Sequence, residues 1–365
     1  MVVTLQSVVP RFVAWVFLSK YVVESQFEIA RSRAAQPHLN AEDLASAILT
    51  LPSISEQEEI ADFLDAKTAK IDVLIAKKRE LIGQLKEKRA ALIAHAVTRG
   101  LPPDAAAAAG FDRDPPRKPS GIQWLGDIPD HWGLAPLCYL VKFRGGSTPS
   151  KDNPEFWDGE TPWVSAKDMK VWEIGDSIDH VSEEALRETS LTVLPHDSVL
   201  IVVRGMILIH TFPVARTTAN VTINQDMKAL LAGPRILPAF LQFALSGFSK
   251  VFISLTDESA HGTRKIEQAV LARFMLAIPP IREQEAIVNY LELERERTDL
   301  LLSKVMVIVA QLSEYRSSLI TAAVTGKIDV RGWREASNRA SPEVVAMGFA
   351  ALYPSYPGQP HGTRS

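Results

Sequence analysis

The chain has 365 residues, of which 46% are hydrophobic and 23% charged, and its formal net charge is -3. This is an ordinary soluble composition for about two domains, and it is not the strongly basic one that would point directly to nucleic acid. Any DNA contact would need local basic groups or a partner that supplies phosphate contacts. The single cysteine, Cys138, excludes an intrachain disulfide and fits a reducing cytoplasm; we expect its side chain to be buried.

The N-terminal segment 1–50 is apolar, but its longest uninterrupted apolar run, 12–18, is too short to cross a bilayer. The segment also lacks the basic start and small-residue cleavage site of an export signal, so we expect a cytoplasmic protein. Residues 12–15 echo 240–243, which predicts that 1–50 is the end of a domain equivalent to a later one. About 120 residues of that first domain would then be missing from the chain.

An internal repeat organises the rest of the sequence. Residues 51–98 and 278–325 align without a gap and share 19 identities in 48 positions, including Glu56 with Glu283 and Gln57 with Gln284. Apolar residues recur in each copy with a spacing of three and four, which predicts one long helix over 51–100 and another over 279–328. About 45 helical residues would span roughly 65–70 Å, and such a stripe needs a partner of similar length. The seam residues that we expect to pair the helices are Ile60, Leu64, Ile71, Leu74, Leu85, Leu92, Ile287, Leu291, Leu301, Ile308, Leu312 and Leu319.

The charges favour pairing of the two helices with each other. Between Lys67 and Arg89 there are eight basic and three acidic residues, whereas between Glu283 and Glu314 there are three basic and seven acidic residues. Opposite charges beside matching seams favour such a pair within the chain. Two alternatives stay open: each charge run is a solvated helix face, or the basic run contacts DNA phosphates.

Between the two helices, 101–120 is rich in proline and alanine and is expected to be an exposed linker. Residues 121–278 contain short β-rich runs broken by turn residues, which predicts a mixed α+β domain. The last segment, 329–365, has no periodicity and many turn formers, and we expect a disordered tail.

Several local motifs in this order resemble the specificity subunits of type I restriction-modification systems. The domain opens with Trp124, Gly126, Pro129 and Trp132, and Gly146 to Ser150 with Thr161 to Asp168 is similar to the core of a target recognition domain. The repeated Pro, Glu and Gln pattern before each helix, and the closing segment 319–328, are similar to the family's helical regions. The resemblance covers about 1–330 and is very specific because the motifs are ordered and duplicated.

The resemblance implies an α+β fold with one complete target recognition domain, two long antiparallel coiled-coil helices and the end of a second recognition domain at the N-terminus. It implies a non-catalytic subunit that reads half of a split site in double-stranded DNA and docks methyltransferase subunits, while nuclease/translocase subunits join later. It implies no cofactor of its own, because S-adenosylmethionine, ATP and Mg would belong to the partners. With one complete domain, the chain would assemble with a second copy, borrow a domain from another polypeptide, or be a gene remnant.

No catalytic constellation accompanies this resemblance. The run from Asp114 to Arg117 is superficially similar to an adenine methyltransferase motif, but arginine replaces the aromatic residue that stacks a flipped base. The histidines show no metal-ligand spacing with Cys138. A coiled-coil scaffold without DNA reading and a stand-alone enzyme remain the competing hypotheses.

Base edges in the major groove are read by amide, hydroxyl and basic side chains. The candidates in the domain are Arg144, Ser147, Thr148, Lys151, Ser165, Lys167, Arg204, His210, Arg216, Thr263, Arg264 and Lys265. For each, a turn former or a solvated charge is the competing interpretation, and for His210 it is a core position. We expect Asn224 and Gln225 to satisfy buried backbone groups, and Trp157 and Trp163 to lie in the core.

Overall fold

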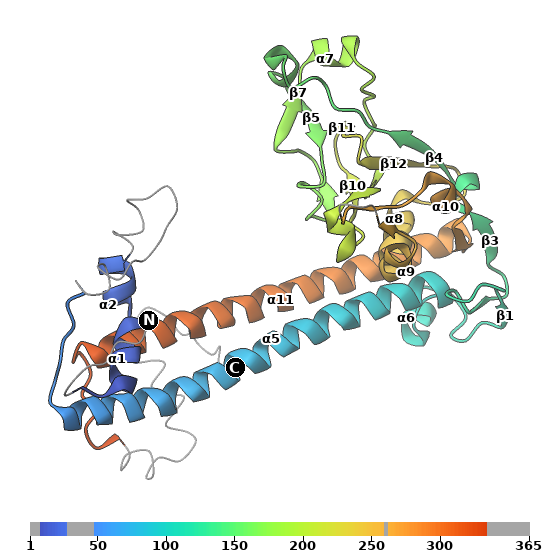
Figure 1. Ribbon diagram of the computed structural model, residues 1–365. Coiled ribbons are helices and arrows are strands. Elements are labelled where there is room, and N and C mark those ends of the chain that lie inside the picture. Colours follow the sequence, from blue (N-terminus) through green and yellow to red (C-terminus); the bar gives the residue numbers. More distant parts are fainter. Residues whose placement is uncertain (1–7, 28–46, 259–261, 334–365) are drawn as a thin grey trace, which may run out of the picture. The chain divides into compact units, whose positions relative to one another are not determined.

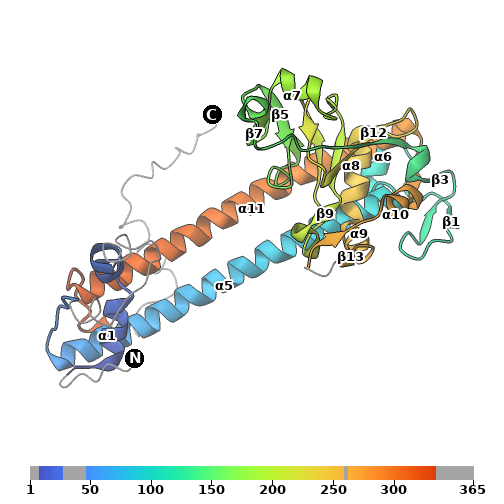
Figure 2. The same cartoon turned by 45° about the horizontal axis from the view of Figure 1, so that its top comes forward.

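The computed structural model describes residues 8–27, 47–258 and 262–333, which fall into two compact units. Unit 1 is drawn from 1–82 and 304–365, and unit 2 is 83–303. Helices α5 (Ile54–Arg99) and α11 (Ile281–Val324) contribute to both units. Figures 1 and 2 show them side by side with opposite chain directions. Within the described ranges, no helix is long and apolar enough to cross a membrane.

Both long helices are slightly shorter than the expected ranges, because capping residues set their ends. Before α5, Glu56 Oε2 accepts hydrogen bonds from the backbone N–H (3.1 Å) and hydroxyl (2.8 Å) of Ser53, which forms a capping box. Helix α11 begins directly after two prolines, which cannot donate a backbone hydrogen bond but suit a helix start. After α5 the chain turns at Gly100 with φ +88°, a conformation in which glycine has no steric penalty.

The helix seam has a different phase from the predicted one in the middle of each helix. Leu74, Leu301 and Ile308 were expected in the seam but are exposed by 46%, 49% and 38%. Their neighbours Ile75 and Leu302 are buried instead. Of the other expected seam residues, six are buried (Ile60, Leu64, Ile71, Ile287, Leu291 and Leu312) and three half-buried (Leu85, Leu92 and Leu319). Consecutive apolar residues in both helices leave the three-four pattern with two possible phases, which is why the sequence alone selected the wrong neighbour.

Two cross-helix ion pairs occur in the described chain, and the repeat relates them. Asp72 Oδ1 lies 2.8 Å from Arg316 Nε in unit 1, and Asp299 Oδ1 lies 2.6 Å from Arg89 Nη1 in unit 2. Aspartate and arginine occupy equivalent positions in the two copies. The same aspartate–arginine interaction therefore occurs once in each unit, and it fixes the antiparallel register of α5 and α11.

The repeated glutamine explains why the two copies share a sequence motif. Gln57 and Gln284 are 2% and 0% exposed. The Gln57 Oε1 accepts a hydrogen bond from the N–H of Val9 (2.9 Å), and the Gln284 Oε1 accepts one from the N–H of Leu237 (2.9 Å). Each acceptor serves the residue just before a short helix, so one buried amide attaches equivalent helices to the start of each long helix. We call this arrangement the glutamine clamp.

The clamped helices are α1 (Pro10–Phe17) in unit 1 and α8 (Pro238–Gly247) in unit 2. Unit 1 also contains α2 (Lys20–Val22) and the π-helical turn η1 (Val23–Phe27). Its core joins Phe12, Leu64 and Ile320 with Val330. Residues 329–333 were expected to begin a disordered tail, but Val330 is buried and Trp333 packs on Phe63; 334–365 lie outside the described residues.

Unit 2 contains the mixed α+β domain. Its strands are β1 (Arg117–Pro119), β2 (Asp127–Pro129), β3 (Gly133–Pro136), β4 (Val141–Gly145), β5 (Thr161–Val164), β6 (Glu173–Ile174), β7 (Asp179–Val181), β8 (Val199–Val202), β9 (Arg204–Gly205), β10 (Val214–Thr217), β11 (Thr222–Ile223), β12 (Met227–Ala232), β13 (Asp257–Glu258), β14 (Arg264–Lys265) and β15 (Met275–Ile278). Its shorter helices are α6 (Pro103–Ala108), α7 (Glu183–Glu188), α9 (Ser249–Ser254) and α10 (Gln268–Arg273), with 3₁₀ turns η2 (Leu137–Tyr139), η3 (Pro154–Trp157) and η4 (Met206–Ile209).

A five-stranded sheet in the order β4-β12-β8-β10-β6 forms the centre of unit 2. Strand β8 is buried along its whole length, and α8 packs beside it with Phe240 and Phe243 in the core. A three-stranded sheet, β11-β5-β7, lies beyond it. Strands β5 and β11 are parallel, and Trp163 pairs with Thr222 in their register.

Two local expectations for this unit are corrected. The expected linker 101–120 contains α6 and β1, and β1 pairs with β2. Cys138 lies in η2 and is exposed rather than buried, because the chain turns there between β3 and β4.

Candidate nucleic-acid interface

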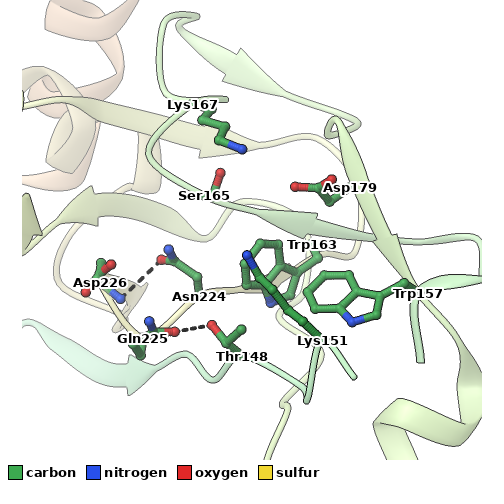
Figure 3. A pocket seen from close by; sticks show the side chains of 10 residues that line it. All are labelled: Thr148, Lys151, Trp157, Trp163, Ser165, Lys167, Asp179, Asn224, Gln225 and Asp226. Atoms are coloured by element: carbon green, nitrogen blue, oxygen red, sulfur yellow. Dashed lines mark hydrogen bonds between the residues drawn. The ribbon is translucent and has the colours of Figure 1, made fainter. Parts of the chain in front are cut away.

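A cavity of about 590 Å³ opens at the ends of β5 and β11 in unit 2 (Figure 3). Because these strands are parallel neighbours, the residues that follow them, Ser165 and Asn224, emerge at the same edge, and the Asn224 N–H donates to the Val164 carbonyl at 3.0 Å. The side chains that line the cavity are Thr148, Lys151, Trp157, Trp163, Ser165, Lys167, Asp179, Asn224, Gln225 and Asp226. The cavity therefore combines two indoles with amide, hydroxyl, ammonium and carboxylate groups.

Two tryptophans hold the loop 147–151 against this edge. The Nε1 of Trp163 donates to the Ser147 carbonyl, and the Nε1 of Trp157 donates to the Ser150 carbonyl, each at 3.0 Å. The two rings meet edge to face with centroids 5.0 Å apart. Trp163 is buried as expected, whereas Trp157 is only half-buried and faces the cavity. The two indoles thus fix the backbone of this loop at the cavity edge.

Gly146 permits the close approach of this loop to β11. A Cβ at this position would lie 2.1 Å from the Ile223 carbonyl oxygen, so any other residue would push the loop away. The Ser147 N–H donates to that same carbonyl at 3.0 Å. The glycine that precedes the polar loop residues is therefore required by packing.

Hydrogen bonds orient the polar groups of the cavity. The Thr148 hydroxyl donates to the Gln225 side-chain oxygen, and the Asp226 N–H donates to Asn224 Oδ1 at 3.1 Å. Arg204 Nε donates to Asp226 Oδ1 at 2.6 Å. Asn224 satisfies a backbone group as expected, whereas Gln225 is exposed and leaves its amide N–H groups facing the cavity.

The structure brings some of the predicted DNA-contacting residues together. Thr148, Lys151, Ser165 and Lys167 line the cavity, and Ser147 lies in the same loop. Figure 3 shows Lys167 and Lys151 on opposite sides of the opening. Sequence reasoning missed Gln225 as a cavity residue, and its position two residues after a β-rich run was the signal that could have revealed it.

Other candidates lie away from the cavity. Arg144 is exposed on β4, Thr263, Arg264 and Lys265 lie at β14, and His210 is exposed after η4 rather than buried in the core. None of them lines the described cavity, although β14 pairs with β9, which carries Arg204. These residues remain predictions of a wider contact surface.

Arg216 forms ion pairs with two carboxylates. Its guanidinium donates to Asp197 Oδ1 at 2.5 Å and also bonds Glu173. Burial would raise the pKa of Asp197, but hydrogen bonds from Arg216 and His196 outweigh it and lower that pKa below its usual value. Arg216 is therefore neutralised locally and is a poor phosphate ligand.

A family model for the type I restriction modification DNA specificity domain matches residues 15–83 and 129–300. The chain belongs to this family. The predicted fold class, a mixed α+β recognition domain with two long antiparallel helices, is thereby confirmed.

Individual relatives agree with this assignment. The chain is 34% identical over 157 residues to the Escherichia coli type I restriction enzyme EcoR124I/EcoR124II specificity subunit, a match that covers 43% of this chain and 39% of the relative. It is 24% identical over 317 residues to the E. coli EcoBI specificity subunit, covering 81% of this chain and 61% of the relative. A solved chain from a study of complex assembly and conformational transition of the type I R-M system shares the fold, with a TM-score of 0.58, 17% identity and coverage of 87% and 71%. The chain thus spans less than two thirds of these curated relatives.

Proposed function

We propose that this chain is a sequence-specific DNA-recognition subunit of a type I restriction-modification complex and that unit 2 reads one half-site. The observation that best supports this proposal is the edge of the cavity. There a loop and the ends of two strands, held by the packed sheet, present Thr148, Lys151, Lys167 and Gln225. Family membership supports the same role.

The chemistry of this edge suits DNA. Amide side chains such as Gln225 pair with adenine N6 and N7, and hydroxyls such as Thr148 serve as donor or acceptor to base edges. Lysines position the duplex through its phosphates. Asp179 and Asp226 share the cavity, and acidic groups accept from cytosine N4 and repel misplaced phosphates.

We propose that the chain itself is non-catalytic and needs no cofactor. Methyl transfer and ATP-driven cleavage would belong to methyltransferase and nuclease/translocase partners in the cytoplasm, with S-adenosylmethionine, ATP and Mg bound there. A net charge of -3 supports a need for phosphate contacts from a partner, because a chain with more acidic than basic residues has little non-specific affinity for DNA.

We propose that a methyltransferase partner docks on an exposed apolar row of α11. Leu293, Leu300 and Leu301 are exposed by 47%, 57% and 49%, and Leu293 and Leu300 are one heptad apart on the same helix face. Exposed apolar side chains in such a row mark a surface for another helix. Leu300→Glu should abolish co-purification with the methyltransferase subunit without changing thermal unfolding of the chain.

The test is co-expression with the cognate methyltransferase subunit, followed by sequencing of methylated sites. The wild type should produce a bipartite methylated motif, and Gln225→Ala should relax or change one half of it. Gln268→Ala, an exposed glutamine on α10 outside the cavity, is the matched control and should leave the motif unchanged. An altered motif with the control only would place the base contacts outside the cavity and contradict the proposed site, whereas a complex that forms without any new methylation would favour the scaffold hypothesis.

A further inference from the structure

The cavity at the ends of β5 and β11 has a buried floor as well as the edge described above. Trp163, Ser165 and Asn224 line it and are only 6%, 6% and 8% exposed. Its volume of about 590 Å³ lies within the range of about 300–1,000 Å³ that is usual for ligand pockets. The cavity therefore has room for a group that enters it.

A base that stays in the duplex does not reach this floor. The base edges of B-DNA lie at the bottom of the grooves, so a protein reads them with side chains that project into a groove. A recess in the protein is filled instead by a group that projects from the DNA. A phosphate and a base extruded from the stack are the two groups of this kind.

The charges of the cavity favour a base over a phosphate. Lys151 and Lys167 are exposed at its opening, where they suit the phosphates that flank an entering group (Figure 3). Asp179 and Asp226 also line the cavity. Arg204 pairs with Asp226 at 2.6 Å, but no ion pair of Asp179 occurs within the described ranges. A phosphate inside would meet the Asp179 carboxylate as a like charge, whereas a base is neutral.

A donor and an acceptor are in place for the edge of such a base. Asn224 Oδ1 accepts from the Asp226 N–H at 3.1 Å, so Nδ2 is the group left to donate. Among the residues that the structure describes, neither Asn224 Nδ2 nor the Asp179 carboxylate has a hydrogen-bond partner. An amino-bearing base would donate to Asp179 and accept from Asn224. Trp157 is half-buried at the cavity, and its indole suits stacking against the base.

An exposed apolar side chain stands beside this cavity on a loop that is held in place. Ile178 directly precedes Asp179 and is 71% exposed. Its N–H donates to Asp168 Oδ1 at 3.0 Å, and Oδ2 of the same carboxylate accepts from the Ser165 N–H at 2.8 Å. Single exposed apolar residues are common, but one carboxylate attaches this one to the cavity floor. Proteins that unstack DNA insert such side chains between base steps.

The charged groups near Ile178 are compatible with an approaching phosphate backbone. The exposed Asp176 places Oδ1 2.7 Å from His180 Nε2. The loop that carries Asp168 also carries Lys167 and Lys170, both exposed. These two lysines offset the acidic residue on the neighbouring loop.

We propose that unit 2 holds one amino-bearing base of its DNA target in this cavity, unstacked from the duplex, and that Ile178 fills the place which the base leaves. The inference rests on the proposed function, because unit 2 must first bind the duplex. It adds a step to recognition, since the cost of opening a base pair then contributes to the choice of sequence.

The first test is a mismatch scan with the complex of the chain and its cognate methyltransferase subunit. At each position of the half-site read by unit 2, one base is kept and its opposite base is changed to a mismatch. The methylated base is left out, because methyltransferases extrude their own target. We expect one position at which the mismatch strengthens binding at least about fivefold, because the pair is already open. Mismatches elsewhere should weaken binding.

Two variants connect that position to the cavity. Asp179→Asn and Ile178→Ala should each weaken binding to the matched duplex at least about fivefold and abolish the advantage of the mismatch, because extrusion is no longer favoured. Val193→Ala is the matched control, since Val193 is 43% exposed and does not line the cavity, and it should behave like the wild type. Thermal unfolding of all three variants checks that the fold is unchanged.

A fluorescent base gives a readout that does not depend on affinity. 2-Aminopurine fluoresces more strongly when it is unstacked. Placed at the position that the scan identifies, it should brighten in the wild-type complex and much less in the complex with Ile178→Ala. An equal signal with both chains would overturn the role of Ile178.

Three other outcomes are distinguishable. Mismatches that weaken binding at every position would overturn the extruded base and leave groove reading by unit 2 intact. Saturable binding of free adenosine, cytidine or guanosine to the chain, measured by tryptophan fluorescence, together with no favoured mismatch, would assign the cavity to a free nucleoside and also overturn it. A complex that binds its methylated motif no better than a scrambled duplex would contradict the proposed function itself, and this inference with it.

Discussion

Gln284 makes three hydrogen bonds from a fully buried side chain: it accepts from Leu237 and donates to the carbonyls of Arg235 (3.0 Å) and Pro279 (2.9 Å). We expect Gln284→Met to destabilise unit 2 by about 2–3 kcal/mol, because the apolar isostere leaves buried backbone groups without partners. Urea unfolding with hydrogen exchange at α8 measures this. Gln57→Met, which removes the hydrogen bonds to Val9 and Pro52 in unit 1, is the comparison and should leave exchange at α8 unchanged.

Two basic residues of unit 2 should behave in opposite ways on DNA. Lys167 is exposed at the cavity mouth, so Lys167→Ala should reduce the slope of log affinity against log salt concentration by about 0.9. Arg216→Ala should leave the slope unchanged, because Asp197 and Glu173 already neutralise that charge. Filter binding of the methyltransferase complex across a salt series distinguishes them, and equal losses would contradict the interface drawn here.

The sequence identified these side chains as candidates for DNA contact, but it could not show which of them are paired with carboxylates. Base-reading residue types were visible at Thr148 and Lys167, because polar residues followed strand-like runs. Whether a cation is free or paired depends on carboxylates far away in sequence, as Glu173 and Asp197 are from Arg216. The pairing of β6 with β10 and the turn before β8 bring Arg216 to these carboxylates. Neither feature can be predicted from the local sequence pattern.

At the scale of elements, two adjacent residues of the helix seam should differ in how much their substitution lowers the free energy of unfolding. Ile75→Ala should destabilise unit 1 by about 2–4 kcal/mol, since Ile75 is 7% exposed and packs with Ile71 and Leu312. Leu74→Ala should cost far less, because Leu74 is 46% exposed. Thermal or urea unfolding of both variants measures the phase of the seam, and a reversed order would restore the phase expected from the sequence.

The existence and approximate length of the helices followed from the repeat, because 3.6-residue periodicity is a strong signal over forty residues. Their antiparallel direction was implied only by the resemblance to the family. The phase of the seam could not be predicted from the sequence. Leu300, Leu301 and Leu302 are three consecutive apolar residues, and only packing against the facing helix decides which of them is buried. The opposite net charges of the two helices favoured pairing. The ion pairs described between the helices, however, join Asp72 to Arg316 and Arg89 to Asp299. Exposed basic residues such as Lys77 and Lys86 remain solvated.

At the scale of the whole molecule, the chain should bind DNA weakly when alone. Its net charge of -3 gives little counterion release, so the affinity for a target duplex at physiological salt should rise sharply when the methyltransferase subunit is added. Fluorescence anisotropy with and without that subunit measures the gain. Tight binding by the isolated chain, unaffected by the partner, would contradict this division of phosphate contacts.

The glutamine clamp has a consequence for how such a protein acquires new targets. Gln284 holds the main-chain groups of Arg235, Leu237 and Pro279 rather than their side chains, so it is indifferent to the sequence of the domain it secures. A foreign domain whose helix begins with the same backbone turn would fit this glutamine equally well. The start of each long helix thus provides a support that does not depend on the side chains of the domain above it, and, under the proposed function, exchange of the segment between Gly100 and Pro279 would change the DNA sequence that is read while this support stays the same.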